Sequence, residues 1–149
     1  MTTPLRCVVD TSVCIKQYIC DPLTPEVNQL FEHLANPQTD FFVPDLFYTE
    51  CANTLWKYIR AGLYTAAEVQ ADLATLKALP LRVVSTSDLK EDAVSIGLTY
   101  RISAYDACYV ALSQQVSAML LTLDQRLVRS IAAAYDVRSF NDFSVPPLP

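Results

Sequence analysis

Residues 5–12 read LRCVVDTS, a short β-branched run that ends in an aspartate followed by two hydroxyl residues. The run predicts a strand, and Thr11 or Ser12 can cap a helix that follows it. The stretch therefore predicts a strand that turns directly into a helix, with Asp10 at the turn. Asp10 is the only acidic side chain in this otherwise interior-like stretch. Because a lone buried carboxylate is costly, we expect a compensating group near it.

The alternation of strand and helix patterns continues through the chain. Further strand patterns lie at residues 41–43, 81–84, 118–123 and 137–140, and helical patterns at 11–20, 24–34, 45–60, 65–79, 87–98, 103–115 and 125–134. Strands that alternate with helices indicate an α/β fold with a mostly parallel sheet covered on both faces. In such sheets, ligands bind beyond the carboxyl ends of the strands.

The composition is that of one globular domain. The chain has 149 residues, of which 52% are hydrophobic and 18% charged, so we expect residues 1–149 to form a single domain, with a proline-rich tail that frays from about residue 141. No apolar run reaches the length of a membrane span, and the N-terminus shows no signal-peptide pattern, so we expect a cytoplasmic protein without a membrane partner. The five cysteines contain no C-x-x-C pair and are expected to be reduced packing residues.

Four carboxylates stand at positions where they can meet. Asp10 and Asp124 follow predicted strands, whereas Glu50 and Asp106 lie in the first turns of predicted helices. All four can therefore open onto one edge of the sheet, and Asn53, three positions after Glu50, shares its helix face and could orient it.

Each acid also has an ordinary structural explanation. Asp10 could form an Asx turn, Asp124 could be only an N-cap, Asp106 could complement a helix dipole, and Glu50 could be solvated. Four independent coincidences at compatible positions are less expected than one site. The acids are therefore interpreted together.

The residue types in this group favour a hard metal ion. Oxygen-only ligation selects Mg²⁺ or Mn²⁺ over Zn²⁺. Such an ion makes a bound water a better nucleophile and stabilises charge on an attacked phosphate, so metal-assisted phosphodiester hydrolysis is the natural reaction class. The only histidine, His33, is expected at the surface, which leaves histidine-based nucleophilic catalysis poorly supported.

Two further groups of residues have weaker patterns. We expect Trp56 to pack the long helix around it rather than to stack a base. Six basic residues flank the presumed site segments and could hold phosphates, although scattered basic residues are usually only solvated: Lys16, Lys57, Arg60, Arg101, Arg126 and Arg129. A net charge of -5 argues against a protein that coats nucleic acid non-specifically, yet does not exclude a nuclease.

Four segments, in order, resemble the motifs of PIN-domain ribonucleases. They are VVDTSV from residue 8, PDLFYTECANTL from residue 44, YDACYVAL from residue 105 and LLTLDQRL from residue 120. The resemblance implies an α/β/α sandwich in which Asp10, Glu50, Asp106 and Asp124 hold Mg²⁺ or Mn²⁺ and hydrolyse single-stranded RNA or tRNA. It also implies that Ser12 supports the metal site, that Asn53 lies beside it, and that Thr122 shapes the last loop.

Single-domain chains of this length look most like VapC-type toxins of toxin–antitoxin pairs. That likeness implies a homodimer, and an antitoxin whose basic segment blocks the acidic cleft, a charge match that the acidic chain favours. Some members place a second acid or an asparagine just after the last motif aspartate. Gln125 and Arg126 stand there in this chain, which leaves open whether one or two ions bind.

Two other classes of enzyme or signalling domain also place an aspartate at the end of a strand. A phosphoaspartate enzyme of the D-x-D type fails at Ser12, and a receiver domain would need a lysine after a late strand, whereas the last lysine is Lys90. A PIN nuclease of RNA processing that is not a toxin, and a PIN-like fold kept only to bind RNA or protein, both remain alternatives.

Overall fold

Five parallel strands form the centre of the molecule, in a computed structural model that describes residues 3–149. The strand order is β3-β2-β1-β4-β5, and all four neighbouring pairs are parallel. The mostly parallel sheet expected from the sequence is therefore confirmed. The strands span Arg6–Val9 (β1), Asp40–Pro44 (β2), Arg82–Val84 (β3), Met119–Thr122 (β4) and Val137–Ser139 (β5).

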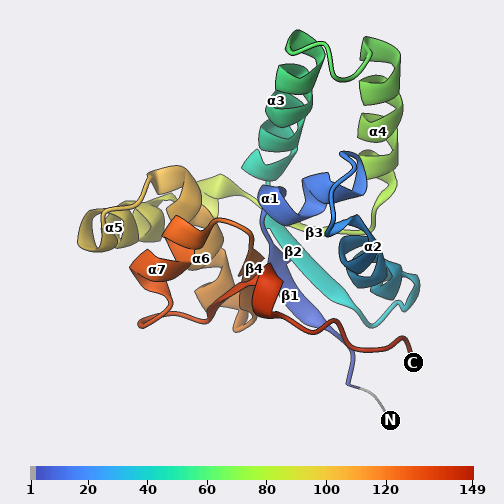
Figure 1. Cartoon of the computed structure of the whole chain (residues 1–149). Coiled ribbons are helices and arrows are strands. Elements are labelled where there is room, and N and C mark those ends of the chain that lie inside the picture. The colour runs from blue at the N-terminus through green and yellow to red at the C-terminus, as the bar shows by residue number, and fades with distance from the viewer. Residues whose placement is uncertain (1–2) are drawn as a thin grey trace.

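Helices cover both faces of this sheet (Figure 1). Because crossovers between parallel strands are right-handed, the helices after β1 lie on one face and those around β4 on the other. The α-helices span Thr11–Cys14 (α1), Thr24–Glu32 (α2), Leu46–Arg60 (α3), Ala66–Ala78 (α4), Lys90–Tyr100 (α5), Ala104–Val116 (α6) and Gln125–Ile131 (α7). Helices α3 and α4 form a hairpin that projects away from the sheet (Figure 1).

Side-chain caps fix where several helices begin. Thr65 accepts from the amide of Glu68 at 3.1 Å, and Ser103 accepts from the amide of Asp106 at 3.1 Å. Both caps were expected from the sequence, since each satisfies a backbone donor that the first turn leaves free. The first helix is shorter than expected, because after Cys14 the chain tightens into a 3₁₀ turn at Ile15–Gln17.

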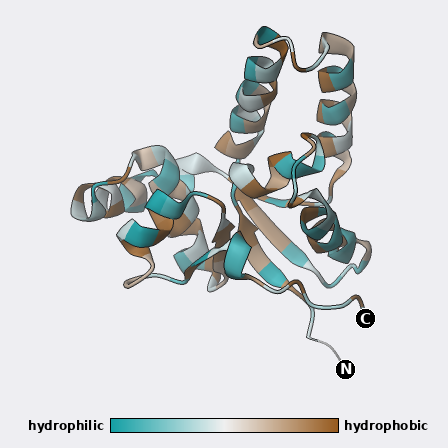
Figure 2. Cartoon of the chain, viewed as in Figure 1, coloured by the Kyte–Doolittle hydropathy of each residue, from teal (hydrophilic) through white to brown (hydrophobic). Residues whose placement is uncertain are grey.

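The core lies between the sheet and the helices, where the strands are largely apolar (Figure 2). Helix α6 packs over β1, β2 and β4, and its side chains from Ala107 to Ser113 are all buried. All five cysteines are free, as expected, and four of them are buried, with Cys20 exposed. Among the helices of residues 3–149, none is both long enough and apolar enough to cross a membrane.

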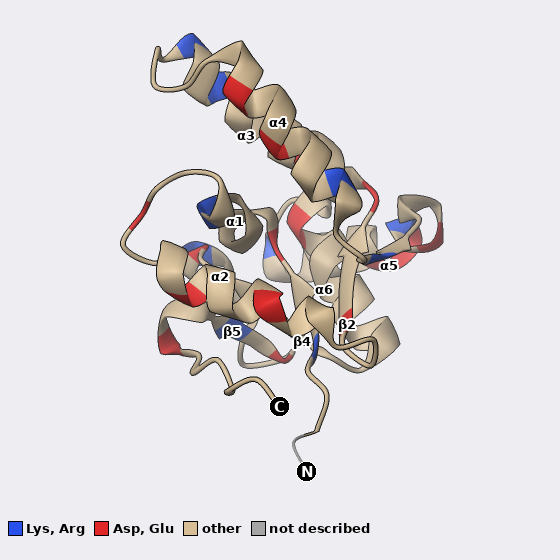
Figure 3. Ribbon diagram, turned by 90° about the vertical axis from the view of Figure 1, so that its right-hand side faces the viewer, with Lys and Arg blue, Asp and Glu red and all other residues tan. Residues whose placement is uncertain are grey.

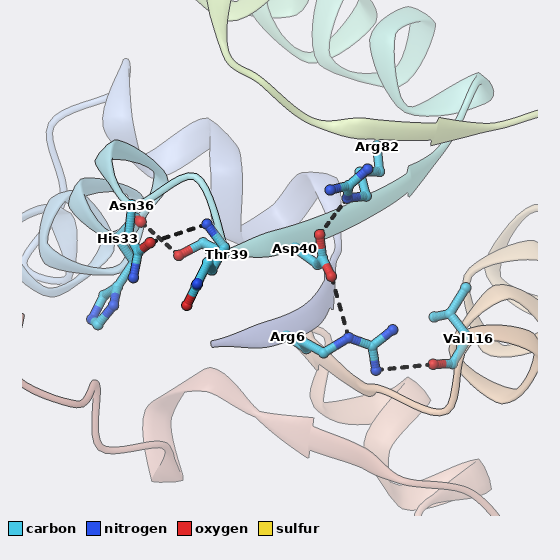
Figure 4. Close-up of polar contacts among 8 residues, drawn as sticks. Arg6, His33, Asn36, Thr39, Asp40, Arg82 and Val116 are labelled. Atoms are coloured by element: carbon cyan, nitrogen blue, oxygen red, sulfur yellow. Dashed lines mark hydrogen bonds and ion pairs between the residues drawn. The ribbon is translucent and has the colours of Figure 1, made fainter. Parts of the chain in front are cut away.

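Ion pairs join three strands at the opposite, amino-terminal edge of the sheet (Figure 4). Asp40 of β2 pairs with Arg82 of β3 and, at 3.4 Å, with Arg6 of β1. The hydrogen bond from Arg82 contributes most to holding the pKa of Asp40 below its usual range. Asp40 is therefore paired with two arginines at this edge of the sheet.

The expectation that His33 lies at the surface is wrong. His33 is only 5% exposed, and its Nε2 lies 2.8 Å from the carbonyl oxygen of Pro146. The hydroxyl of Thr39 also donates to the His33 carbonyl at 2.7 Å. The polar residues around His33 in the sequence suggested exposure, but the C-terminal segment, which carries no helix or strand after residue 142, folds back over it.

We predict that Gly97→Ala destabilises the fold, because α5 and α6 meet closely at this glycine. A Cβ at Gly97 would lie 2.9 Å from the backbone carbonyl oxygen of Ile102, which cannot move without shifting the corner. The expected loss is about 1–3 kcal/mol in the free energy of unfolding, measured by urea titration. Ser95→Ala, at an exposed position of the same helix, is the control and should change little. Equal stability of Gly97→Ala and the wild type would show that the corner relaxes freely.

Candidate active site

The candidate site lies at the carboxyl edge of the sheet, where β1 and β4 run side by side. From these two strands the chain departs in opposite directions, to β2 and to β5, which makes this pair the topological switch point where such folds bind ligands. Asp10 directly follows β1, and its amide donates to the Leu121 carbonyl of β4 at 3.0 Å. Asp124 follows β4 by two residues.

Two hydroxyl groups hold the carboxylate of Asp10. Ser12 Oγ and Thr122 Oγ1 each donate to Asp10 Oδ2 at 2.7 Å. An ionised carboxylate can only accept, which sets the direction of these bonds. The same hydroxyl oxygens accept from the amides of Leu123 and Asp124, both at 3.0 Å. A carboxylate that receives two hydroxyl protons is stabilised as an acceptor, so the network orients Asp10 in its ionised form.

Burial nevertheless dominates the titration of Asp10. Burial raises the pKa of Asp10, the bonds from Ser12 and Thr122 offset part of that rise, and the charge of Asp124 adds to it. The folded chain therefore holds a carboxylate whose charge is unfavourable in the absence of a cation.

Glu50 is held from the other side of the site. Its Oε1 accepts from the Tyr109 hydroxyl at 2.5 Å and from Thr11 Oγ1 at 3.3 Å. Burial raises the pKa of Glu50, the Tyr109 bond partly opposes this, and the charges of Asp10 and Asp106 raise it further. Among the described donors, none binds Oε2, which leaves this oxygen available to a ligand.

Asp106 and Asp124 complete the acidic edge. Burial raises the pKa of Asp106, and the negative charges of Asp10 and Asp124 raise it further. These two side chains are therefore close enough to Asp106 to repel its charge. Asp106 lies in the first turn of α6, where the helix is only partly buried. Asp124 is exposed, and its Oδ1 accepts from the Leu127 amide at 3.1 Å. It therefore caps the N-terminus of α7, as the sequence suggested, and its other carboxylate oxygen takes no part in that cap.

No basic side chain neutralises this group. Within residues 3–149, the ion pairs formed by lysine and arginine involve other acids: Asp21, Asp40, Glu91 and Asp136. In the same described part, no three acidic, histidine or cysteine side chains converge closely enough to hold one ion together. The structure thus gathers the four acids at one edge without drawing three of them into a common coordination shell.

The residues expected to support the site divide into two groups. Ser12 and Thr122 lie in direct contact with Asp10, as described above. Asn53 is exposed one turn beyond Glu50, and no hydrogen bond joins these two residues, both of which the structure describes.

Thr11 and Tyr109 belong to the site although the sequence did not predict either of them. Thr11 Oγ1 lies 3.0 Å from the Tyr109 hydroxyl, and both contact Glu50, so they link α1, α6 and α3 around one carboxylate. The spacing in the sequence could have indicated Tyr109, because it follows Asp106 by three residues and so lies on the same face of the helix. Burial of a tyrosine hydroxyl indicates a polar partner, which the sequence alone did not identify.

Comparisons with known proteins place the chain in a family. The profile of the PIN domain family matches residues 7–133. A protein named Ribonuclease VapC3 from Pyrobaculum aerophilum is 31% identical over 131 residues, which cover 87% of this chain and 97% of that protein.

Solved structures share the fold at lower identity. The crystal structure of PAE2754 from Pyrobaculum aerophilum matches with a TM-score of 0.70 and 19% identity, covering 92% of this chain and 90% of the other. A toxin–antitoxin complex from Klebsiella pneumoniae contains a chain that matches with a TM-score of 0.62 and 16% identity, covering 95% and 99%. The predicted α/β fold is thus shared by these proteins over nearly their whole length.

We predict that Asp10→Asn stabilises the metal-free protein at neutral pH. Because the pKa of Asp10 is raised on folding, its charge opposes folding above that pKa, and this effect disappears as the pH falls through it. The variant should unfold about 2–4 °C higher in EDTA at pH 7, the shift that about 1 kcal/mol produces in a chain of this size. The difference should narrow on acidification, measured by thermal unfolding.

A matched variant separates this effect from general charge reduction. Asp92→Asn removes an exposed acid from α5 and should leave the unfolding temperature nearly unchanged. A lower unfolding temperature for Asp10→Asn than for the wild type at pH 7 would contradict the assignment of Asp10 as an uncompensated charge.

Proposed function

Because this chain belongs to the PIN domain family, we propose that it is a VapC-type ribonuclease that hydrolyses phosphodiester bonds of single-stranded RNA with a bound Mg²⁺ or Mn²⁺. The observation that carries the proposal is the acidic edge itself. Asp10, Glu50, Asp106 and Asp124 lie together at the switch point, and no lysine or arginine among residues 3–149 pairs with any of them. The relative named Ribonuclease VapC3 supports the same activity for a chain of almost equal extent.

The residues present fit a magnesium or manganese ion. The donors are carboxylate oxygens, and burial together with the neighbouring acids raises the pKa values of Asp10, Glu50 and Asp106, which supports a role for a compensating cation. Mg²⁺ commonly binds through one or two carboxylates and retains several waters, so a convergence of three side chains is not required. We propose Asp10, Glu50, Asp106 and Asp124 as the acids that hold it. When bound, such an ion supplies a more acidic water and stabilises negative charge on the attacked phosphate.

The chain's own contribution is to hold the acids in place. Ser12 and Thr122 bind one oxygen of Asp10, and Tyr109 and Thr11 bind one oxygen of Glu50. Each carboxylate therefore presents a fixed orientation at the edge without reorganising when substrate arrives. Such preorganisation is a large part of electrostatic catalysis.

The proposal extends to partners. We propose residues 1–149 as one nuclease domain that forms a homodimer and is controlled by a small antitoxin. A protein with a similar fold was solved as a toxin–antitoxin complex, which supports an antitoxin as the partner of this chain. An antitoxin segment rich in lysine and arginine would complement the acidic edge, and the chain's net charge of -5 favours such a match.

We predict that Asp106→Asn removes Mg²⁺-dependent cleavage of single-stranded RNA while the protein stays folded. Loss of one acid at a preorganised phosphate site should lower kcat by about 100-fold or more. Gel-based cleavage of a labelled oligonucleotide, with circular dichroism on the same sample, measures both properties. Asp92→Asn is again the control and should cleave as the wild type does. Full cleavage by a folded Asp106→Asn variant would remove Asp106 from the proposed site.

For the toxin role, we predict that expression of the chain arrests growth and that Asp106→Asn abolishes the arrest. Co-expression of the small protein encoded next to it should relieve the arrest, since its basic segment would cover the acidic edge. Colony counts after induction measure the effect. Normal growth with abundant soluble and cleavage-competent protein would favour an RNA-processing nuclease. Binding of RNA without metal-dependent cleavage would favour a fold used only for binding.

A further inference from the structure

The single tryptophan of the chain lies on the projecting hairpin and not in the core. Trp56 on α3 is 48% exposed, which contradicts the expectation that it packs the helix. The side of α3 that is buried is formed instead by Phe47, Cys51 and Leu55. An exposed aromatic ring beside a candidate nuclease site offers a face on which a base can stack.

Basic and polar side chains accompany Trp56 on the same face of α3. Asn53, Lys57 and Arg60 follow Glu50 by three, seven and ten residues, a spacing that places them on one side of a helix. All three are exposed, and Figure 3 shows basic positions toward the end of the hairpin that lies away from the sheet. This row, together with Trp56, is here called the α3 strip. It begins at the acidic edge and leads away from it.

Arg60 fixes the indole ring. Its guanidinium carbon lies 5.1 Å from the centre of the Trp56 ring, a cation–π contact that covers one side of the indole. The ring is therefore held in place while nearly half of the side chain stays accessible. Neither Lys57 nor Arg60 forms an ion pair with an acid in the described part of the chain, so both charges are available to a ligand.

The hairpin is anchored to the body, so the α3 strip has a fixed relation to the site. The hydroxyl of Tyr64, in the connection between α3 and α4, donates to the Tyr18 carbonyl at 3.0 Å, and its ring packs edge-on against Tyr58. Trp56 is also part of the same helix as Glu50. At about 1.5 Å per residue, it lies roughly 9 Å along the helix axis from Glu50.

We propose that the α3 strip binds the RNA strand beside the scissile bond, with one base stacked on Trp56 and the adjoining phosphates held by Lys57 and Arg60. This inference rests on the ribonuclease proposed above. An aromatic ring combined with cations is the surface that single-stranded nucleic acid requires, because bases stack on the ring and phosphates need positive charge. The charge on the strip also argues for RNA over an antitoxin segment, since a basic peptide would be repelled by Lys57 and Arg60.

The fluorescence of Trp56 tests the stacking directly, because the chain has no other tryptophan. The Asp106→Asn variant is titrated with an octamer of single-stranded RNA in Mg²⁺, so that the strand is bound without being cut. Stacking should quench the emission in a saturable way, and an RNA duplex of the same length should quench it much less. This readout needs no cleavage, so it remains informative even if the chain proves not to be a ribonuclease.

Cleavage kinetics test the role of the strip in the reaction. Trp56→Ala, in an otherwise wild-type chain, should raise KM for single-stranded RNA by about 10- to 100-fold with a small effect on kcat, and Trp56→Phe should restore most of the loss. Lys57→Ala should weaken binding and reduce the slope of log affinity against log salt by about 0.7. Lys77→Ala, which removes an exposed lysine from α4 in the same hairpin, is the matched control and should change neither.

Three results would overturn the proposal. One is saturable RNA binding without a change in Trp56 emission, and another is a wild-type KM for Trp56→Ala. The third is a wild-type dimer that Trp56→Ala converts to a monomer in sedimentation, which would assign the strip to a contact between two copies of the chain.

Discussion

The uncompensated charge of Asp10 is the constraint on which the carboxyl edge of this molecule depends. The carboxylate follows a strand whose last three residues are buried, and its environment raises its pKa. Ser12 and Thr122, which are 110 positions apart, meet on one of its oxygens and thereby join the turn after β1 to the loop after β4. The same hydroxyls accept the amides of Leu123 and Asp124, so the backbone of the last loop is shaped by the group that orients Asp10. Fold and site are therefore coupled through one carboxylate.

A site built in this way is less stable than the fold could be. Burial and mutual repulsion raise the pKa values of Asp10, Glu50 and Asp106 together, so each charge disfavours the others until a cation arrives. At the opposite edge, Asp40 lies between Arg6 and Arg82, and its pKa is lowered. One sheet thus carries a paired acid at its amino-terminal edge and unpaired acids at its carboxyl edge. Unpaired acids at this edge are what the proposed ribonuclease would need to bind a cation.

The sequence predicted most of the fold because its signals are local. The strand that ends at Asp10, the caps at Thr65 and Ser103, and the alternation of strands and helices each depend on a few neighbouring residues. Contacts between distant segments were not predictable in this way. His33 is covered by the C-terminal segment, and Tyr109 meets Glu50 across two helices, and neither contact leaves a pattern in the surrounding residues. The exposure of Trp56 was not predicted for a related reason. It depends on which side of α3 packs against the rest of the molecule, and that side is set by distant segments.

Helix α3 carries an acidic residue near one end and two basic residues near the other. Its first turns carry Glu50 into an acidic edge that needs a cation, whereas its exposed outer turns carry Lys57 and Arg60 beside an exposed ring. A polyanion would be repelled by the acidic edge alone, particularly in a chain whose net charge is -5. A basic strip that begins next to that edge would hold the strand without lowering the negative charge that the metal needs. In the ribonuclease proposed here, separation of the two charges along one helix would allow metal binding and strand binding to coexist, which neither cluster could provide by itself.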